Sequence, residues 1–163
     1  MATTAQNNLV YTPGGNPRGL RWPVDSSGNH DVNQGDMVYL SSGTSYLLNP
    51  CASDANAANL YGVAGETSYI NPYGLKTYFP TIVVFFGSVF FFNTTSGDTY
   101  NNGVAIYNAG VDAQTITNAS GSNPIGYAYL NTPGTIGTAP TVAGGSNVTL
   151  PVFIVAVKPT TLA

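Results

Sequence analysis

Two segments of the sequence follow the same order of turns and apolar runs. The first begins at Gly35-Asp36 and ends with Tyr61-Gly62-Val63-Ala64, and the second begins at Gly97-Asp98 and ends with Ile125-Gly126-Tyr127-Ala128. In both, a Gly-Asp pair precedes a strand, a glycine marks a hairpin, and an apolar-Gly-x-Ala strand returns. Neither segment could cover its own apolar face. The sequence therefore predicts a duplicated half-barrel.

The rest of the chain is divided into short apolar runs by turn residues, including 19 Gly and 11 Pro. No window shows a sustained 3.6-residue apolar period, so we expect little or no helix. Residues 52–59 are polar and form a connector or at most one helical turn. The expected strands are 37–40, 45–48, 60–64, 81–86, 88–92, 104–107, 115–117, 125–130 and 148–157. This spacing predicts an all-β barrel or sandwich with two similar halves, about 32–92 and 93–157.

The most apolar stretch, residues 79–92, is too short to cross a membrane as a helix, which takes about 20 residues. Gly87 divides it, so we expect two strands that meet at a bend or bulge. Continuous apolarity indicates burial on both faces, either inside the domain or beneath a neighbouring subunit. Phe85, Phe86 and Phe90 are therefore candidate interface residues.

Residues 1–31 are predicted to form an extended N-terminal arm before a β-domain at 32–163. Three prolines, at positions 13, 17 and 23, hinder ladder pairing in this arm. One interpretation is a flexible terminus. The other is an arm that reaches across a neighbouring subunit, with Arg18, Arg21 and Trp22 as contacts, because Arg and Trp concentrate binding energy at interfaces.

Charge is scarce: charged residues make up 7% of the chain, which carries a net charge of −3 with four basic residues. This excludes phosphate recognition by a basic face and argues against a basic membrane-binding helix, so we expect neither a nucleic-acid nor a membrane partner. A surface with so few charges is instead typical of a protein engaged in contacts. The first residues lack the basic and apolar regions of a signal peptide, and none is predicted.

Catalytic or metal-binding chemistry has only weak candidates. His30 lies near Asp25 and Asp36, which suggests either a metal or acid–base site or a polar loop that caps its own backbone. Cys51 could act as a nucleophile or as a small buried hydrophobe, and we expect the latter. The single glutamate, Glu66, has no defined carboxylate partner. We expect no enzyme activity, no metal site and no cofactor.

Five segments, spread over about residues 32–157, resemble the head decoration (cement) proteins of tailed bacteriophages. They are Gly35-Asp36-Met37-Val38-Tyr39-Leu40, Leu60-Tyr61-Gly62-Val63-Ala64, Gly87-Ser88-Val89-Phe90, Asn123-Pro124-Ile125-Gly126-Tyr127-Ala128 and Val148-Thr149-Leu150-Pro151-Val152. The resemblance implies a small β-barrel-like virion protein on the outer surface of the phage head. It also implies two partners, the major capsid protein and further copies of the chain, commonly as trimers, and neither catalysis nor a cofactor.

Aromatic residues leave a second function open. The chain has 11 Tyr, which are hard to bury in number because each hydroxyl needs a hydrogen-bond partner. Exposed tyrosines suit protein contacts, but they also stack on sugar rings. A carbohydrate-binding, lectin-like β-sandwich is therefore the alternative to a decoration protein.

Overall fold

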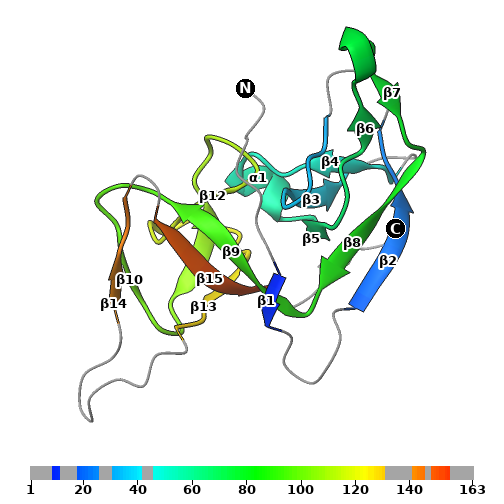
Figure 1. Cartoon of the computed structure of the whole chain (residues 1–163). Helices are drawn as coiled ribbons and strands as arrows, with labels where there is room; N and C mark the ends of the chain where they lie inside the picture. Colours follow the sequence, from blue (N-terminus) through cyan, green and yellow to red (C-terminus); the bar gives the residue numbers. More distant parts are fainter. Residues whose placement is uncertain are drawn as a thin grey trace.

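The computed structural model describes residues 9–11, 18–25, 31–41, 46–130, 141–145 and 148–154. It confirms the predicted all-β class: the described chain is built of short strands, with helix limited to α1 (Asp54–Ala57) and the 3-10 turn η1 (Pro72–Gly74). The strands form two curved sheets that lie side by side (Figure 1). Apart from β1 (Leu9–Tyr11), which joins the C-terminal sheet, each of these two sheets uses one half of the chain.

The N-terminal half forms a five-stranded sheet in the order β2-β8-β5-β3-β4. One parallel bridge, Val24 to Leu48, brings β4 back beside the end of β2, so the sheet almost closes on itself. The strands are β2 (Arg18–Pro23), β3 (Met37–Leu40), β4 (Leu48–Pro50), β5 (Leu60–Ala64) and β8 (Thr81–Phe86).

The C-terminal half forms a closed five-stranded barrel in the order β9-β12-β11-β13-β15, with β15 paired back to β9. A further strand, β1 (Leu9–Tyr11), pairs with β9 from outside the ring. The barrel strands are β9 (Ser88–Thr94), β11 (Ala105–Asn108), β12 (Thr115–Thr117), β13 (Gly126–Ala128) and β15 (Thr149–Ile154).

Two small antiparallel pairs complete the described strands. In the C-terminal half, β10 (Thr99–Asn101) pairs with β14 (Thr141–Ala143). In the N-terminal half, β6 (Tyr69–Ile70) pairs with β7 (Thr77–Tyr78).

The two halves are similar, as predicted, and the structure shows that the similarity extends to the strand register. The six pairs of β2 with β8 run from Arg18–Phe86 to Pro23–Thr81, and the six pairs of β9 with β15 run in the same way from Ser88–Ile154 to Asn93–Thr149. The strand that closes each ring is parallel in both halves. Strand order, direction and register therefore all repeat.

Two glycines show why the repeated Gly-x-Ala motif is needed. A Cβ at Gly62 would lie 2.4 Å from the carbonyl oxygen of Phe85, and a Cβ at Gly126 would lie 2.3 Å from that of Phe153. Phe85 and Phe153 occupy equivalent places in β8 and β15. A side chain at either glycine would thus collide with the backbone of the neighbouring strand.

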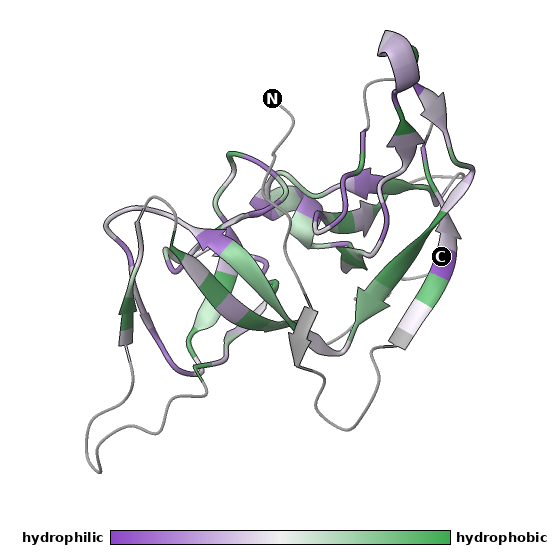
Figure 2. Ribbon diagram, in the orientation of Figure 1, coloured by the Kyte–Doolittle hydropathy of each residue, from purple (hydrophilic) through white to green (hydrophobic). Residues whose placement is uncertain are grey.

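The boundary between the halves differs from the predicted one. The chain passes directly from β8 to β9 through Gly87, which adopts φ 67°, so the predicted bend is confirmed. The first half therefore spans 18–86 and the second 88–154, rather than 32–92 and 93–157. The predicted boundary placed β9 in the first half. The succession of strands in the sequence does not show to which of the two rings β9 belongs. The apolar β8 and β9 are both mostly green in Figure 2.

Part of the predicted arm belongs to this sheet. Residues 18–23 were expected to lie outside the domain core, but they form β2 and pair with β8 along its whole length. Pro23 is the last residue of β2, a strand at the end of the sheet order with β8 as its neighbour. At this position the missing N–H group of proline disrupts no ladder of hydrogen bonds. Residues 1–8 and 12–17 of the arm lie outside the described residues.

Most of the other predicted strands are found within a few residues, and 52–59 does contain one helical turn. Ser53 caps that turn by accepting a hydrogen bond from the Asn56 N–H. The strand expected at 45–48 is instead β4, displaced toward Pro50. Cys51 is fully buried in the larger of two core clusters, as predicted.

Candidate protein-interaction site

The hairpin formed by β6, η1 and β7 projects from the N-terminal half (Figure 1). It connects β5 to β8, which are themselves paired neighbours in the sheet. Its turn, Asn71-Pro72-Tyr73-Gly74, contains consecutive left-handed residues, with φ 57° at Tyr73 and 80° at Gly74. Glycine tolerates this conformation, whereas for tyrosine it is uncommon and costs on the order of 1–2 kcal/mol.

Large apolar side chains are exposed along this projection. Tyr73 is fully exposed and Leu75 is 75% exposed, while Ile70 and Phe79 are each exposed over almost half of their surface. Exposed apolar patches and strained backbone residues both occur preferentially at functional sites. Because this projection has both, it is a candidate contact surface. We call Ile70, Tyr73, Leu75 and Phe79 the apolar tip.

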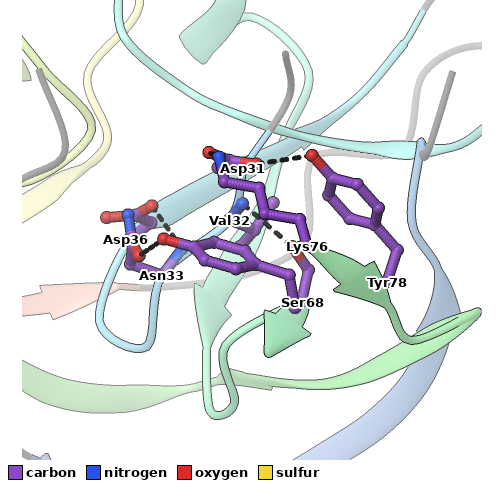
Figure 3. Close-up of polar contacts among 8 residues, drawn as sticks. Asp31, Val32, Asn33, Asp36, Ser68, Lys76 and Tyr78 are labelled. Carbon is purple, nitrogen blue, oxygen red and sulfur yellow. Dashed lines mark hydrogen bonds and ion pairs between the residues drawn. The ribbon is translucent and has the colours of Figure 1, made fainter. Parts of the chain in front are cut away.

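Polar contacts fix the base of the hairpin to residues 31–33, the segment that precedes β3 (Figure 3). The Tyr78 hydroxyl donates a hydrogen bond to Asp31 Oδ1 at 2.8 Å, and Lys76 forms an ion pair with the other oxygen of Asp31. The Lys76 ammonium also lies 4.8 Å from the centre of the Tyr69 ring. Lys76 and Tyr78, both on the β7 side of the hairpin, thus meet one carboxylate, while Tyr69 of β6 contacts Lys76.

The backbone adds a second set of contacts. Val32 donates its N–H to Ser68 Oγ at 3.0 Å, and Ser68 returns its own N–H to the Val32 carbonyl at 2.8 Å. Tyr69 donates its hydroxyl to Asn33 Oδ1 at 3.1 Å. Residues 31–33 thus run along the hairpin base and hold the apolar tip in a defined place.

The charges at this base remain paired over a broad pH range. Burial favours the neutral form of Asp31, but hydrogen bonds from Lys76 and Tyr78 outweigh it and hold the pKa of Asp31 below its ordinary value. The hydrogen bond to Asp31 raises the pKa of both Lys76 and Tyr78. All three shifts move these pKa values away from neutral pH, so the contacts among Asp31, Lys76 and Tyr78 persist over a broad pH range.

Asp36 is the described carboxyl group with a strongly raised pKa, and it lies between the two halves. Burial raises the pKa of Asp36 to about 6, although the Asn33 N–H and the Gln114 amide both donate to it. The Gln114 Nε2 is 2.6 Å from Asp36 Oδ1, while the Gln114 Oε1 is buried without a hydrogen-bond partner. This contact joins the two halves of the fold.

The described residues also contain no candidate metal site. Within the described residues, no three His, Cys, Asp or Glu side chains are grouped so as to hold a metal ion. His30, the candidate ligand in the sequence, lies outside those residues. Glu66 accepts a hydrogen bond from the Val83 N–H and pairs with Arg21 at 2.8 Å.

The residues predicted at the interface fall into two places. Pairing of β2 with β8 places Arg18 opposite Phe86, whereas Arg21 and Trp22 lie opposite Val83 and Ile82, further along the strand. The side chain of Arg18 is not described. Arg21 is exposed, whereas Trp22 is half-buried and donates its Nε1–H to the Tyr46 carbonyl at 2.8 Å.

The three phenylalanines predicted at the interface are more buried than exposed surface residues would be. Phe85 and Phe86 are partly buried. Phe90 fills the core of the C-terminal barrel, so it is not a surface residue.

Sequence reasoning missed the apolar tip. Its signal was present as an Asn-Pro-Tyr-Gly turn with Ile70 before it and Leu75 after it, a combination that indicates a tight turn flanked by apolar residues. The pattern says nothing of exposure, because that depends on where the connection leaves the sheet.

Comparison with known proteins does not assign this chain to a family. No protein-family model matches it, and neither does any curated protein. In the described part of the chain, no helix has the length and apolarity to cross a membrane.

Proposed function

We propose that the chain is a structural virion protein that binds the outside of an icosahedral phage capsid and stabilises it. It acts as a homo-oligomer, with the major capsid protein as its partner, and it is not an enzyme. The observation that carries this proposal is the apolar tip, held at a fixed place by the contacts of Asp31. The family resemblance of the five sequence segments supports the same function.

A rigid projection lowers the cost of binding. Ordering a flexible loop on a partner costs conformational entropy, which a preorganised hairpin has already lost. The exposed side chains at its tip include the aromatic ring of Tyr73, a residue type that often dominates interface energetics. A protein with charge on only 7% of its residues also depends on apolar and hydrogen-bonded contacts with its partner.

The test is cosedimentation with expanded shells assembled from the major capsid protein of the same genome. The wild-type chain is expected to bind the shells to saturation and to raise their melting temperature. Tyr73→Asp should weaken binding by a factor of about 10 or more, since it places a charge in the centre of the contact. Val111→Asp is the matched control, because Val111 is an exposed apolar residue away from the hairpin, and it should bind like wild type.

Two results would overturn the proposal. The first is a wild-type chain that does not sediment with the shells. The second is a monomer that instead binds a glycan array, with binding lost on tyrosine substitution, which would establish the lectin-like alternative.

A further inference from the structure

The outer face of the N-terminal sheet is buried by the other half of the chain. Met37 and Val63, which are paired neighbours on β3 and β5, are fully buried. They belong to the same core cluster as Ile106 and Ile116 of the C-terminal barrel. This face of the first half therefore serves as an internal interface.

The surface that covers this face is the end of the C-terminal barrel where β11 turns into β12. There Met37 donates its N–H to the Ala113 carbonyl at 2.9 Å, and Asp36 accepts from Gln114 at 2.6 Å. Nearby, the Asn108 amide donates to the Cys51 carbonyl at 2.9 Å. The contact is thus face to end: the outer face of one half meets the β11–β12 end of the other.

The duplication places an equivalent face on the C-terminal barrel, and it is open. Pairing of β11 with β13 puts Ala105 and Tyr127 where β3 and β5 have Met37 and Val63. Ala105 is only partly buried, and Tyr127 is 47% exposed. None of these residues is charged. Among the described residues, the same face is fully buried in one half and partly exposed in the other.

The N-terminal half also carries the equivalent of the covering end. Between β3 and β4, Ser41 donates its N–H to the Leu47 carbonyl at 3.0 Å, and between β11 and β12, Ala109 donates to the Thr115 carbonyl at 3.0 Å with the same spacing in sequence. Residues 42–45 lie outside the described residues. This register makes Tyr46 the counterpart of Gln114. Tyr46 is partly exposed, and Trp22 donates to its carbonyl.

We propose that a second copy of the chain places the Tyr46 end of its N-terminal half on the Tyr127 face of the first. The contact repeats between copies the face-to-end packing that already exists within each one. A second copy is the occupant because the chain itself provides the matching end. This inference deepens the self-association part of the proposed function and is separate from shell binding by the apolar tip.

The geometry also determines the kind of assembly. The Tyr127 face and the Tyr46 end are two different surfaces, so the contact is not self-complementary. Each copy therefore uses its Tyr127 face for one neighbour and its Tyr46 end for another. Such head-to-tail contacts form a closed ring when the rotation between copies closes, and a filament when it does not. A trimer of this type would alternate six similar half-units around the ring.

Sedimentation equilibrium of three full-length chains tests the inference. Wild type is expected to be a ring of defined mass. Tyr127→Asp should raise its dissociation constant by a factor of about 10 or more, because the charge enters the buried centre of the contact. Tyr73→Asp, on the apolar tip, is the control and should keep the wild-type mass. Unchanged far-UV circular dichroism confirms that each variant folds.

The outcomes separate the two proposals. If the wild type is oligomeric and Tyr127→Asp leaves its mass unchanged, the Tyr127 face is not the interface, although self-association stands. If the wild type is monomeric, both this inference and the self-association part of the proposed function are wrong. Shell binding is then decided by the cosedimentation experiment alone.

Discussion

The two halves of this chain share one backbone plan but differ in what covers them. On the N-terminal half, Met37 and Val63 are buried by the other half, while the equivalent Ala105 and Tyr127 of the C-terminal half are partly exposed. Strand order and register are otherwise the same. The comparison teaches that the duplicated sheet defines the fold, whereas the residues on its outer face determine what each half contacts.

The interiors differ as well. The C-terminal barrel has Phe90 and Phe92 fully buried on β9. The equivalent positions of β2 hold Leu20, which is 49% exposed, and Trp22, which is half-buried. Because β9 pairs on both of its sides and β2 has one full-length partner, the first half closes less completely. The C-terminal barrel should therefore be the more stable half.

The largest effect is expected at the two equivalent glycines. Gly62→Ala and Gly126→Ala each place a Cβ within 2.4 Å of a backbone oxygen. Since a backbone carbonyl cannot rotate away, each should lower the free energy of unfolding by more than about 4 kcal/mol. Urea unfolding followed by the fluorescence of Trp22, the single tryptophan, measures this. Gly145→Ala is the control, because its Cβ would meet nothing closer than 3.7 Å.

A smaller effect should separate the covered face from the open one. Met37→Ala leaves a cavity between the halves and should cost about 3 kcal/mol. The equivalent position already has alanine, and Ala105→Met, on the face that is open within one copy, should change the unfolding free energy of the dissociated chain by less than about 0.5 kcal/mol. The same urea experiment measures both. Equal costs at the two positions would mean that the two faces are covered alike.

Asp36 gives one half a pH dependence that the other lacks, since its counterpart is Val104. Burial raises the folded-state pKa of Asp36 to about 6, above the unfolded value, so the folded chain binds more protons between these two values. Its contribution is full below the unfolded pKa and is lost as the pH rises through 6, by about 2 kcal/mol between pH 4.5 and 7.5. Urea midpoints at pH 4.5 and 7.5 should show this loss in the wild type, and Asp36→Asn should reduce it. A wild type that gains stability from Asp36 over this range would contradict the assignment.

The smallest effect concerns Arg21, which the sequence suggested as an interface residue. Its ion pair with Glu66 is exposed on both sides, so Arg21→Ala should cost less than about 1 kcal/mol. The equivalent residue in the other half is Phe91, which shows that the position does not require a charge. A larger loss in thermal unfolding would indicate that Arg21 holds β2 in the sheet.

The sequence predicted those features that depend on local chemistry. Gly87 and the two Gly-x-Ala strands could be located because a bend or a close backbone approach needs glycine. The match of Gly35 with Gly97 was wrong in detail, because the true counterpart of Gly35 is Gly103: each donates its N–H to the last alanine of its Gly-x-Ala strand at 2.8 Å. A Gly-Asp pair is common turn chemistry, whereas this bond depends on the fold.

The features that could not be predicted depend on three-dimensional position. The apolar tip looks like an ordinary turn in sequence, and only its distance from the sheet exposes Tyr73. Phe90 looks like an interface residue because both faces of its strand are apolar, but the closed ring buries it. Likewise, the open Tyr127 face is visible only when the two halves are compared.

The most direct test of the comparison is chemical cross-linking between positions 46 and 127. Cys51 is fully buried and can stay in place. With a short bis-maleimide, the Tyr46→Cys/Tyr127→Cys double variant should give covalently joined copies, and each single variant should give none, because every contact pairs one residue of each type. A double variant that stays uncoupled where the wild type is oligomeric would contradict the account, as would coupling through Tyr127→Cys alone.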